Sequence, residues 1–305
     1  MIRGAEAIMA DGLSRKRHRK VPEALTQRLG GVEAGLAERM ETATELALAA
    51  GEAIKLVIDQ AKDIENKGAN DLVTATDKAN EELIFQGLRR AFPGDEFIGE
   101  ESSAAAGEIA ALTAAPTWIV DPVDGTTNFV HGFPMTCVSI GFARGGRVDL
   151  GVIYNPCSGE MYQAIRGHGA WLNGKRIRAS GSTTLAGSLV ITEYGCQREE
   201  AAMTRMMDCT RAVLRKCRNL RQVGSGALDL AFVACGRFDA VYSGVAGEGW
   251  KPWDYAAGLV MAEEAGATML SVEGQPFDLF GDSVLCCATR ELAMEIAEIV
   301  RTAQA

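Results

Sequence analysis

The chain has 305 residues, which is enough for one large domain or two fused halves with a substantial core. Hydrophobic residues make up 47% and charged residues 23%, and this composition argues against disorder in the bulk of the chain. The net charge of −9 argues against nucleic acid as the main partner, because a phosphate backbone attracts a basic protein surface.

The chain contains eight cysteines without a C-x-x-C pair and only three histidines, so it has no spacing typical of a zinc site. Most of the cysteines lie in apolar stretches, which indicates reduced, buried thiols and a cytoplasmic protein. No apolar run reaches the roughly 18 residues that span a bilayer, so we expect no membrane partner.

Residues 1–31 form a basic segment that lacks hydrophobic periodicity and ends in Gly30-Gly31. We predict a disordered tail here. An organelle-targeting segment is the alternative, but Glu6 and Asp11 count against it. Residues 32–305 are expected to form one compact domain.

The first half of this domain begins with helices and continues with short strands. Apolar residues at helical spacing predict a long amphipathic helix over 32–60 and a second helix over 78–91, which Pro93-Gly94 ends. A strand is expected over 96–100. Further short apolar stretches predict strands over 116–121, 136–143, 148–154, 161–164 and 171–172, with a hairpin turn at Gly145-Gly146.

The second half alternates strands with helices. Strands are expected over 189–192, 220–223, 240–242, 268–270 and 283–287, and helices over 199–215, 225–235, 254–265 and from 291 onward. An antiparallel first half joined to an alternating second half predicts stacked layers of helix and sheet.

Two carboxylates three residues apart, Asp121 and Asp124, directly follow an apolar strand. Pro122 stiffens the backbone between them, so both can direct oxygens at one point, and the carbonyl of Val123 can join them. Ligation by oxygen alone suits a hard cation such as Mg²⁺.

The segment Gly125-Thr126-Thr127 comes next and exposes backbone N–H groups at a turn. A short helix that began here would receive a phosphate at its first amides, and the threonine hydroxyls add donors. The alternative is a tight Asp-Gly turn between strands, with Asp121 as a cap.

Two further acidic positions strengthen the first interpretation. Glu100 follows another predicted strand, and Asp254 opens the helix that Gly266 ends. Taken singly, Asp254 is explained as a helix N-cap. Taken together, carboxylates at strand ends and a helix start beside a phosphate-like turn indicate a metal-dependent phosphate site.

The motifs of this chain resemble those of a known family. Three segments resemble signatures of the inositol monophosphatase family of lithium-sensitive, Mg²⁺-dependent phosphatases, namely FIGEES, WIVDPVDGTTNFVHGFP and PWDYAAG. Three more agree in order and approximate spacing, namely DLVTATD, GAWLNGKRIRAS and EEAGATM. The resemblance runs from about residue 32 to the C-terminus and implies an αβαβα sandwich of the sugar-phosphatase type, with the active site where its two halves meet.

The resemblance also implies a set of metal ligands. Glu100, Asp121 and the carbonyl of Val123 would bind one Mg²⁺. Asp121 would bridge to a second ion held with Asp124 and Asp254, and Glu100 would reach a weaker third site. The implied reaction is direct attack of a metal-activated water on phosphorus, without a phosphoenzyme.

Other positions resemble the residues that bind and align the reactants. Gly125 and Thr126 match the phosphate-binding positions, and Asp124 also faces the substrate. Asp77 and Thr126 resemble the pair that orients the attacking water, and Lys67 resembles the lysine that supports that region.

The positions expected to contact the polyol part of the substrate follow the family pattern less closely. One segment, RQVGSGALDLAF, matches the part whose backbone contacts the inositol ring, at Gly224, Ser225 and Gly226. Ser243 stands where the family usually has a glutamate that contacts ring hydroxyls, so it would reach the ring only through water or a shifted substrate. Glu248 or Lys251 in the longer loop that follows would substitute.

We therefore expect hydrolysis of inositol monophosphate, a small-molecule phosphate monoester, by a Mg²⁺-dependent enzyme that forms a homodimer. Histidinol phosphate or a sugar 1-phosphate is the alternative substrate, and a nucleotide 3′-phosphatase is disfavoured. An alternative from another class is a regulatory homologue without turnover. The intact set of four carboxylates argues against it.

Overall fold

The computed structural model describes residues 30–303 apart from 61, 63, 67–71 and 248. The predicted tail therefore lies almost entirely outside the described residues, and so do Lys67 and Glu248. No helix in the described part is long and apolar enough to cross a membrane.

The first half contains one large sheet and the helices that cover it. Its elements are α3 (Ala34–Val57), β1 (Ile64–Asn66), β2 (Leu72–Thr74), α4 (Ala75–Ala91), β3 (Glu96–Gly99), α5 (Glu100–Ala106), β4 (Thr117–Asp124), α6 (Thr126–Val130), β5 (Cys137–Arg144), β6 (Arg147–Asn155), β7 (Glu160–Ile165), β8 (Gly169–Leu172) and β9 (Lys175–Arg176).

The second half contains a smaller sheet and its helices. Its elements are a 3₁₀ turn (Leu185–Gly187), β10 (Leu189–Thr192), α7 (Glu200–Leu214), β11 (Asn219–Arg221), α8 (Gly226–Ala234), β12 (Ala240–Ser243), α9 (Pro252–Glu264), β13 (Thr268–Leu270), β14 (Val284–Cys287) and α10 (Arg290–Ala303).

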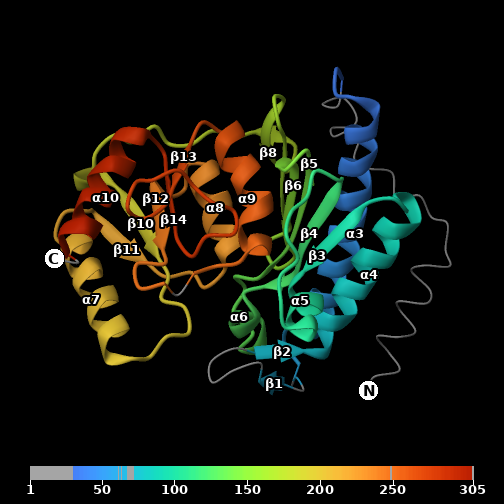
Figure 1. Cartoon of the computed structure of the whole chain (residues 1–305), viewed down its shortest axis with the longest axis horizontal. Coiled ribbons are helices and arrows are strands. Elements are labelled where there is room, and N and C mark those ends of the chain that lie inside the picture. Colours follow the sequence, from blue (N-terminus) through green and yellow to red (C-terminus); the bar gives the residue numbers. More distant parts are fainter. Residues whose placement is uncertain (1–29, 61, 63, 67–71, 248, 304–305) are drawn as a thin grey trace.

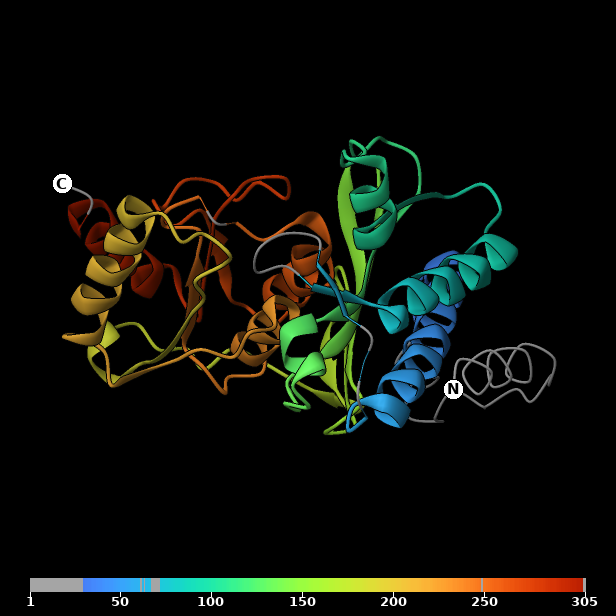
Figure 2. The same ribbon diagram turned by 90° about the horizontal axis from the view of Figure 1, so that it is seen from below.

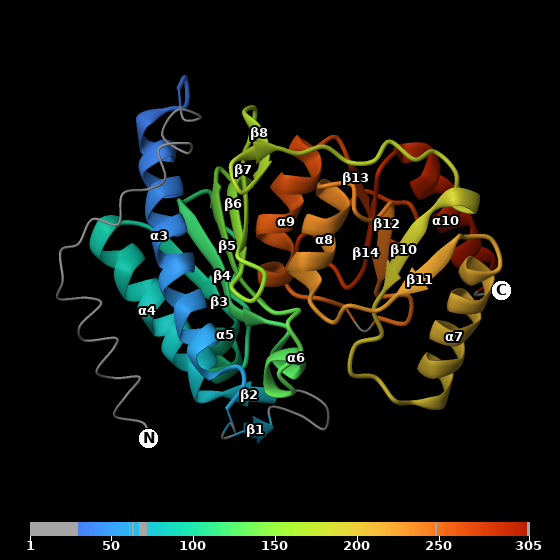
Figure 3. The same cartoon turned by 180° about the vertical axis from the view of Figure 1, so that it is seen from behind.

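These elements stack in five layers, which confirms the predicted αβαβα sandwich. Across Figure 1 they run from α7 and α10, through the five-stranded sheet β11-β10-β12-β14-β13, to α8 and α9. The seven-stranded sheet, in the order β3-β4-β5-β6-β7-β8-β9, and then α3 and α4 complete the sandwich. Figure 3 shows the same order from behind.

The two sheets differ in strand direction as their sequences predict. In the large sheet only β3 and β4 pair in parallel, and antiparallel neighbours such as β5 and β6 need only the short turn at Gly145-Gly146. In the small sheet β10 pairs in parallel with both β11 and β12. Parallel neighbours need long crossovers, and α7 and α8 lie within them.

Apolar periodicity explains the outer helices. Helix α3 buries side chains three or four positions apart against the large sheet, namely Leu36, Met40, Ala43, Ala47, Ala50 and Ile54. Helix α4 begins three residues earlier than predicted, because Thr74 and Asp77 form a reciprocal capping box at its start.

The central layer is fixed by close packing of α9 on the large sheet. Figure 2 shows α8 and α9 between the two sheets. A Cβ atom at Gly151 would lie 2.4 Å from the carbonyl oxygen of Ala257, so only glycine permits this approach. The start of α9 is thereby held against the strands of the first half.

Two boundaries near the motifs differ from the predictions. The strand expected over 116–121 continues to Asp124, and the helix expected from Asp254 begins at Pro252. The strands β1 and β2 and the short helix α5 were not predicted, because each is too short to show a periodicity of its own.

Candidate active site

A bulge at the end of β4 brings Asp121 and Asp124 to one side of the strand. Residues three apart in a regular strand point to opposite faces. Here Asp121 pairs with Ser139 and Asp124 with Cys137, so one extra residue lies in β4 between them. The extra residue compensates for the odd spacing, and Pro122, which has no N–H to donate, lies within the irregularity.

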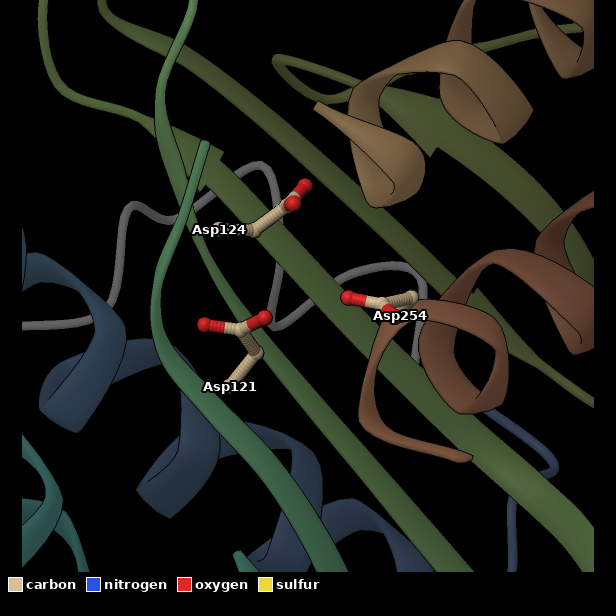
Figure 4. A group of neighbouring side chains, drawn as sticks. All are labelled: Asp121, Asp124 and Asp254. Atoms are coloured by element: carbon tan, nitrogen blue, oxygen red, sulfur yellow. The ribbon is translucent and has the colours of Figure 1, made fainter. Parts of the chain in front are cut away.

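The third carboxylate comes from the second half of the chain. Asp254 is the third residue of α9, and its Oδ2 accepts a hydrogen bond of 2.6 Å from the backbone N–H of Lys251. The carboxylates of Asp121, Asp124 and Asp254, called the acid cluster from here on, offer ligand atoms within 4.8 Å of one another. In Figure 4 the Asp254 carboxylate points from α9 toward Asp121.

The acid cluster is electrostatically unfavourable without a cation. Burial raises the pKa of Asp121 well above its usual range, and the charges of Glu100, Asp124 and Asp254 raise it further. Burial and the charge of Asp124 raise the pKa of Asp254 to about 7. Three crowded oxygen donors with such pKa shifts suit a hard divalent cation, so the residues fit the metal that the sequence predicts.

Glu100 lies beside the acid cluster, at the first position of α5. Its charge raises the pKa of Asp121, although it is not among the three carboxylates whose ligand atoms lie within 4.8 Å of one another. Glu81 fixes this first turn, because its carboxylate accepts hydrogen bonds of 2.8 Å from the N–H groups of Glu101 and Ser102. A Cβ atom at Gly99 would lie 2.4 Å from Glu81, so the glycine leaves room for this carboxylate.

Asp124 is held by the start of α8. The Ser225 hydroxyl lies 2.5 Å from its Oδ2, and the N–H groups of Gly226 and Ala227 lie 3.2 and 2.9 Å from its two oxygens. The Cys137 thiol approaches the same carboxylate at 3.4 Å. Asp124 therefore connects the large sheet with a helix of the second half.

The predicted short helix after Asp124 is present as α6. Gly125 precedes it with φ of 82°, a left-handed conformation that favours glycine. A Cβ atom there would also lie 2.8 Å from the carbonyl oxygen of Met135 and 3.0 Å from that of Gly224. The N-terminus of α6 thus lies beside the acid cluster, as the phosphate-binding interpretation requires.

Asp77 and Thr126, which are 49 positions apart, meet at this turn. The Thr126 Oγ1 lies 3.1 Å from Asp77 Oδ1 and 3.1 Å from the carbonyl oxygen of Val123. Asp77 is fully buried, and it also accepts a hydrogen bond from the Thr74 N–H at 2.9 Å. Burial raises the pKa of Asp77. The structure brings together the pair that the resemblance predicts.

Most of the positions predicted to contact the polyol are buried in the structure. Of the three positions expected to contact a ring, Gly224 is exposed, but Ser225 and Gly226 are buried and bonded to Asp124. A Cβ atom at Gly226 would lie 3.0 Å from the Trp250 indole. Ser243 is 1% exposed at the end of β12, so it has no surface for the predicted substrate contact.

The loop after β12 is anchored on a neighbouring segment. Cβ atoms at Gly244 and Gly249 would lie 2.1 and 2.5 Å from backbone atoms of Asp282. Lys251, named as one replacement for the missing glutamate, has its Nζ 3.9 Å from an oxygen of Asp282. The other replacement, Glu248, lies outside the described residues.

Sequence reasoning missed two residues beside the site. Asn128 donates from Nδ2 to the carbonyl oxygens of Met135 and Val223, both at 2.8 Å. Glu193 accepts hydrogen bonds from the N–H groups of Val223 and Gly224. Asn128 belongs to the motif already singled out, whereas Glu193 follows an ordinary strand and carries no local signal.

Together these groups provide what phosphate hydrolysis needs. The acid cluster offers oxygen ligands to a divalent cation, α6 offers amides to a phosphate, and Asp77 with Thr126 offers a hydrogen-bonding pair for water. All three lie where the first and second halves of the chain meet.

Known proteins resemble this chain over most of its length. The model of the inositol monophosphatase family matches residues 36–305. Inositol monophosphatase 2 of Solanum lycopersicum is 49% identical over 242 residues, which cover 79% of this chain and 90% of that protein. Inositol monophosphatase 2 of Homo sapiens is 42% identical over 267 residues, covering 87% and 91%. Among solved structures, the extragenic suppressor protein suhB of Bartonella henselae has a TM-score of 0.77 at 31% identity and covers 86% of this chain and 98% of its own.

Proposed function

We propose that this chain, which belongs to the inositol monophosphatase family, hydrolyses an inositol monophosphate to inositol and phosphate. The observation that carries the proposal is the convergence of the acid cluster with the Gly125-Thr126 turn. A regulatory homologue without turnover would not need to keep a buried group of mutually repelling carboxylates.

We propose Mg²⁺ as the cation, because the ligands are oxygen atoms alone. Asp121, Asp124 and Asp254 would hold it, joined by Glu100 and the carbonyl oxygen of Val123. When bound, Mg²⁺ supplies Lewis-acid activation of water and neutralises charge on the phosphate.

The remaining residues bind and align the reactants. The first amides of α6, after Gly125, donate to phosphate oxygens. The Thr126 hydroxyl has one proton for two acceptors at 3.1 Å, Asp77 Oδ1 and the Val123 carbonyl oxygen. Whichever acceptor takes it, a lone pair on Thr126 Oγ1 is free to accept a hydrogen bond from the attacking water beside Asp77.

The decisive test is phosphate release from a panel of esters with and without Mg²⁺. Inositol monophosphate should be hydrolysed with Mg²⁺, and EDTA should abolish the activity reversibly. Histidinol phosphate and a sugar 1-phosphate serve as competing substrates. Faster release from either one would contradict the proposed substrate, and full turnover with EDTA would contradict the metal-dependent reaction. Glu200→Gln removes one exposed carboxylate far along the chain from the acid cluster. It is the control for any variant that removes a carboxylate of the acid cluster, and it should keep full activity.

We also propose a homodimer in the cytoplasm. None of the eight cysteines forms a disulfide in the described part of the chain, which fits a reducing compartment. Analytical ultracentrifugation measures the assembly, and a single monomeric species at micromolar concentration would contradict the dimer.

A further inference from the structure

The segment between β11 and α8 determines the orientation of Asp124. Ser225 of this segment and Gly226 and Ala227, the first two residues of α8, supply three hydrogen bonds to that carboxylate. Just before them, Gly224 has a φ of 78°, which turns the chain sharply. A shift of this turn would therefore move the donors that hold Asp124.

Glu193 holds the same turn from the second half. Its Oε1 accepts hydrogen bonds of 2.7 Å from the Val223 N–H and 2.8 Å from the Gly224 N–H. The side chain is 7% exposed and follows directly after β10, which pairs with two other strands. A rigid, buried acceptor thus fixes the two residues that precede the donors to Asp124.

Asp229, on α8, completes the support beneath the turn. Neither of its oxygens has a hydrogen-bond donor among the described residues, and it is fully buried. Burial and the charges of Glu193 and Asp124 raise its pKa well above the usual range, and burial also raises the pKa of Glu193. Glu193 and Asp229 are called the acid pair from here on.

Asn128 fastens the turn from the other side. Its Nδ2 lies 2.8 Å from the Val223 carbonyl oxygen and 3.2 Å from that of Gly224. The same two residues thus donate to Glu193 through their N–H groups and accept from Asn128 through their carbonyls. Glu193 and Asn128 come from different halves, so the turn joins the halves at the site.

We propose that Glu193 is a positioning residue for the proposed phosphatase site: by accepting from Val223 and Gly224, it holds the turn that orients Asp124 toward the cation. This inference rests on the proposed function for its kinetic part, but its cation-binding part needs no substrate.

The test compares Glu193→Ala with Glu193→Gln. The alanine variant leaves the N–H groups of Val223 and Gly224 without their acceptor, so Mg²⁺ half-saturation in a thermal-shift titration should rise about tenfold or more. The glutamine variant keeps an amide oxygen that can accept both hydrogen bonds, and its half-saturation should stay within about threefold of the wild type.

Thr192→Val is the matched control. Thr192 is buried one residue away, at the end of β10, where it pairs with Tyr242 of β12. The control should lower thermal stability without changing Mg²⁺ half-saturation. In kinetics, kcat of Glu193→Ala should fall about tenfold at low Mg²⁺ and recover partly at high Mg²⁺, with a smaller change in KM.

Three outcomes would overturn the inference. These are normal Mg²⁺ binding in Glu193→Ala, a defect in Glu193→Gln equal to that of the alanine variant, and an equal defect in Thr192→Val. If Glu193→Ala does not fold, Glu193→Asp takes its place with the same criteria, because its shorter side chain cannot reach both amides. A wild type that binds Mg²⁺ but releases no phosphate contradicts the proposed function and leaves the titration to decide the role of Glu193.

Discussion

The acid cluster and the acid pair are both buried groups of carboxyls, but their surroundings differ. In the acid cluster, three carboxylates from β4 and α9 face one another, and Glu100 adds a fourth charge. In the acid pair, Glu193 accepts two backbone N–H groups, and burial raises the pKa of Asp229 well above its usual range. Glu193 of the acid pair has two donors within the protein, whereas the carboxylates of the acid cluster face one another and suit a cation. Buried carboxyls can thus bind a cation in the acid cluster and hold a backbone turn in the acid pair.

The largest effect should follow from Asp121→Asn. This change keeps the volume but removes a central charge from the acid cluster, so kcat should fall by roughly a thousandfold. Because repulsion is relieved, the metal-free variant should melt no lower than the wild type. Phosphate release and thermal unfolding in EDTA measure the two effects. A variant that unfolds yet keeps full specific activity in its folded fraction would show that Asp121 is only structural.

The next effect is stabilisation by Mg²⁺. A ligand present at about 100 times its dissociation constant adds about 2.7 kcal/mol to the free energy of unfolding. Mg²⁺ should therefore raise the melting temperature of the wild type by several degrees and that of Asp121→Asn by much less. An equal shift in both proteins would mean that the cation binds elsewhere.

A pH effect of intermediate size is expected in the metal-free protein. The pKa of Asp254 is about 7 in the folded protein, compared with an ordinary value of 3.8. Unfolding between these values releases protons, so the free energy of unfolding should fall as pH rises from about 4 to about 7. Melting in EDTA should therefore occur at a higher temperature at pH 5 than at pH 7.5. Saturating Mg²⁺ should flatten this slope, and a slope that stays unchanged with Mg²⁺ would locate its origin outside the acid cluster.

The smallest effect should come from Asp229→Asn in the acid pair. An asparagine amide can donate to Glu193 without binding a proton, so the variant should melt at the same temperature as the wild type or slightly higher at pH 8. The difference should be the same with and without Mg²⁺, since no cation relieves the acid pair. A variant that melts lower at pH 8 would show that Asp229 is charged and has another partner.

Local patterns predicted the fold well where a segment carries its own periodicity or turn chemistry. The apolar spacing of α3 and the glycines at Gly145-Gly146 each specify one structure. Asp121 and Asp124 could also be predicted as neighbouring carboxylates, because the motif that contains them is continuous in sequence. The bulge that aligns them was not predicted, since it depends on register with β5.

Contacts between distant segments could not be predicted from residue type. Ser225 and Gly226 were predicted to contact the substrate through their backbone, and their hydrogen bonds to Asp124, about 100 positions earlier in the chain, were not predicted. Glu193 has no local signal because its partners lie 30 and 31 positions later. Ser243 has the polarity of a surface residue, and its burial depends on the strands and loop that pack around it.

By itself, the sequence determined the order of helices and strands and the residues able to bind a cation and a phosphate, because periodicity, turn chemistry and ligand type are properties of short segments. Only the tertiary structure decided which of these residues meet. Asp254 joins Asp121 because α9 packs against the large sheet through Gly151, and Asp124 is oriented because a turn from the second half reaches it. Such contacts depend on how the layers pack, and the residue types at either end do not specify that packing.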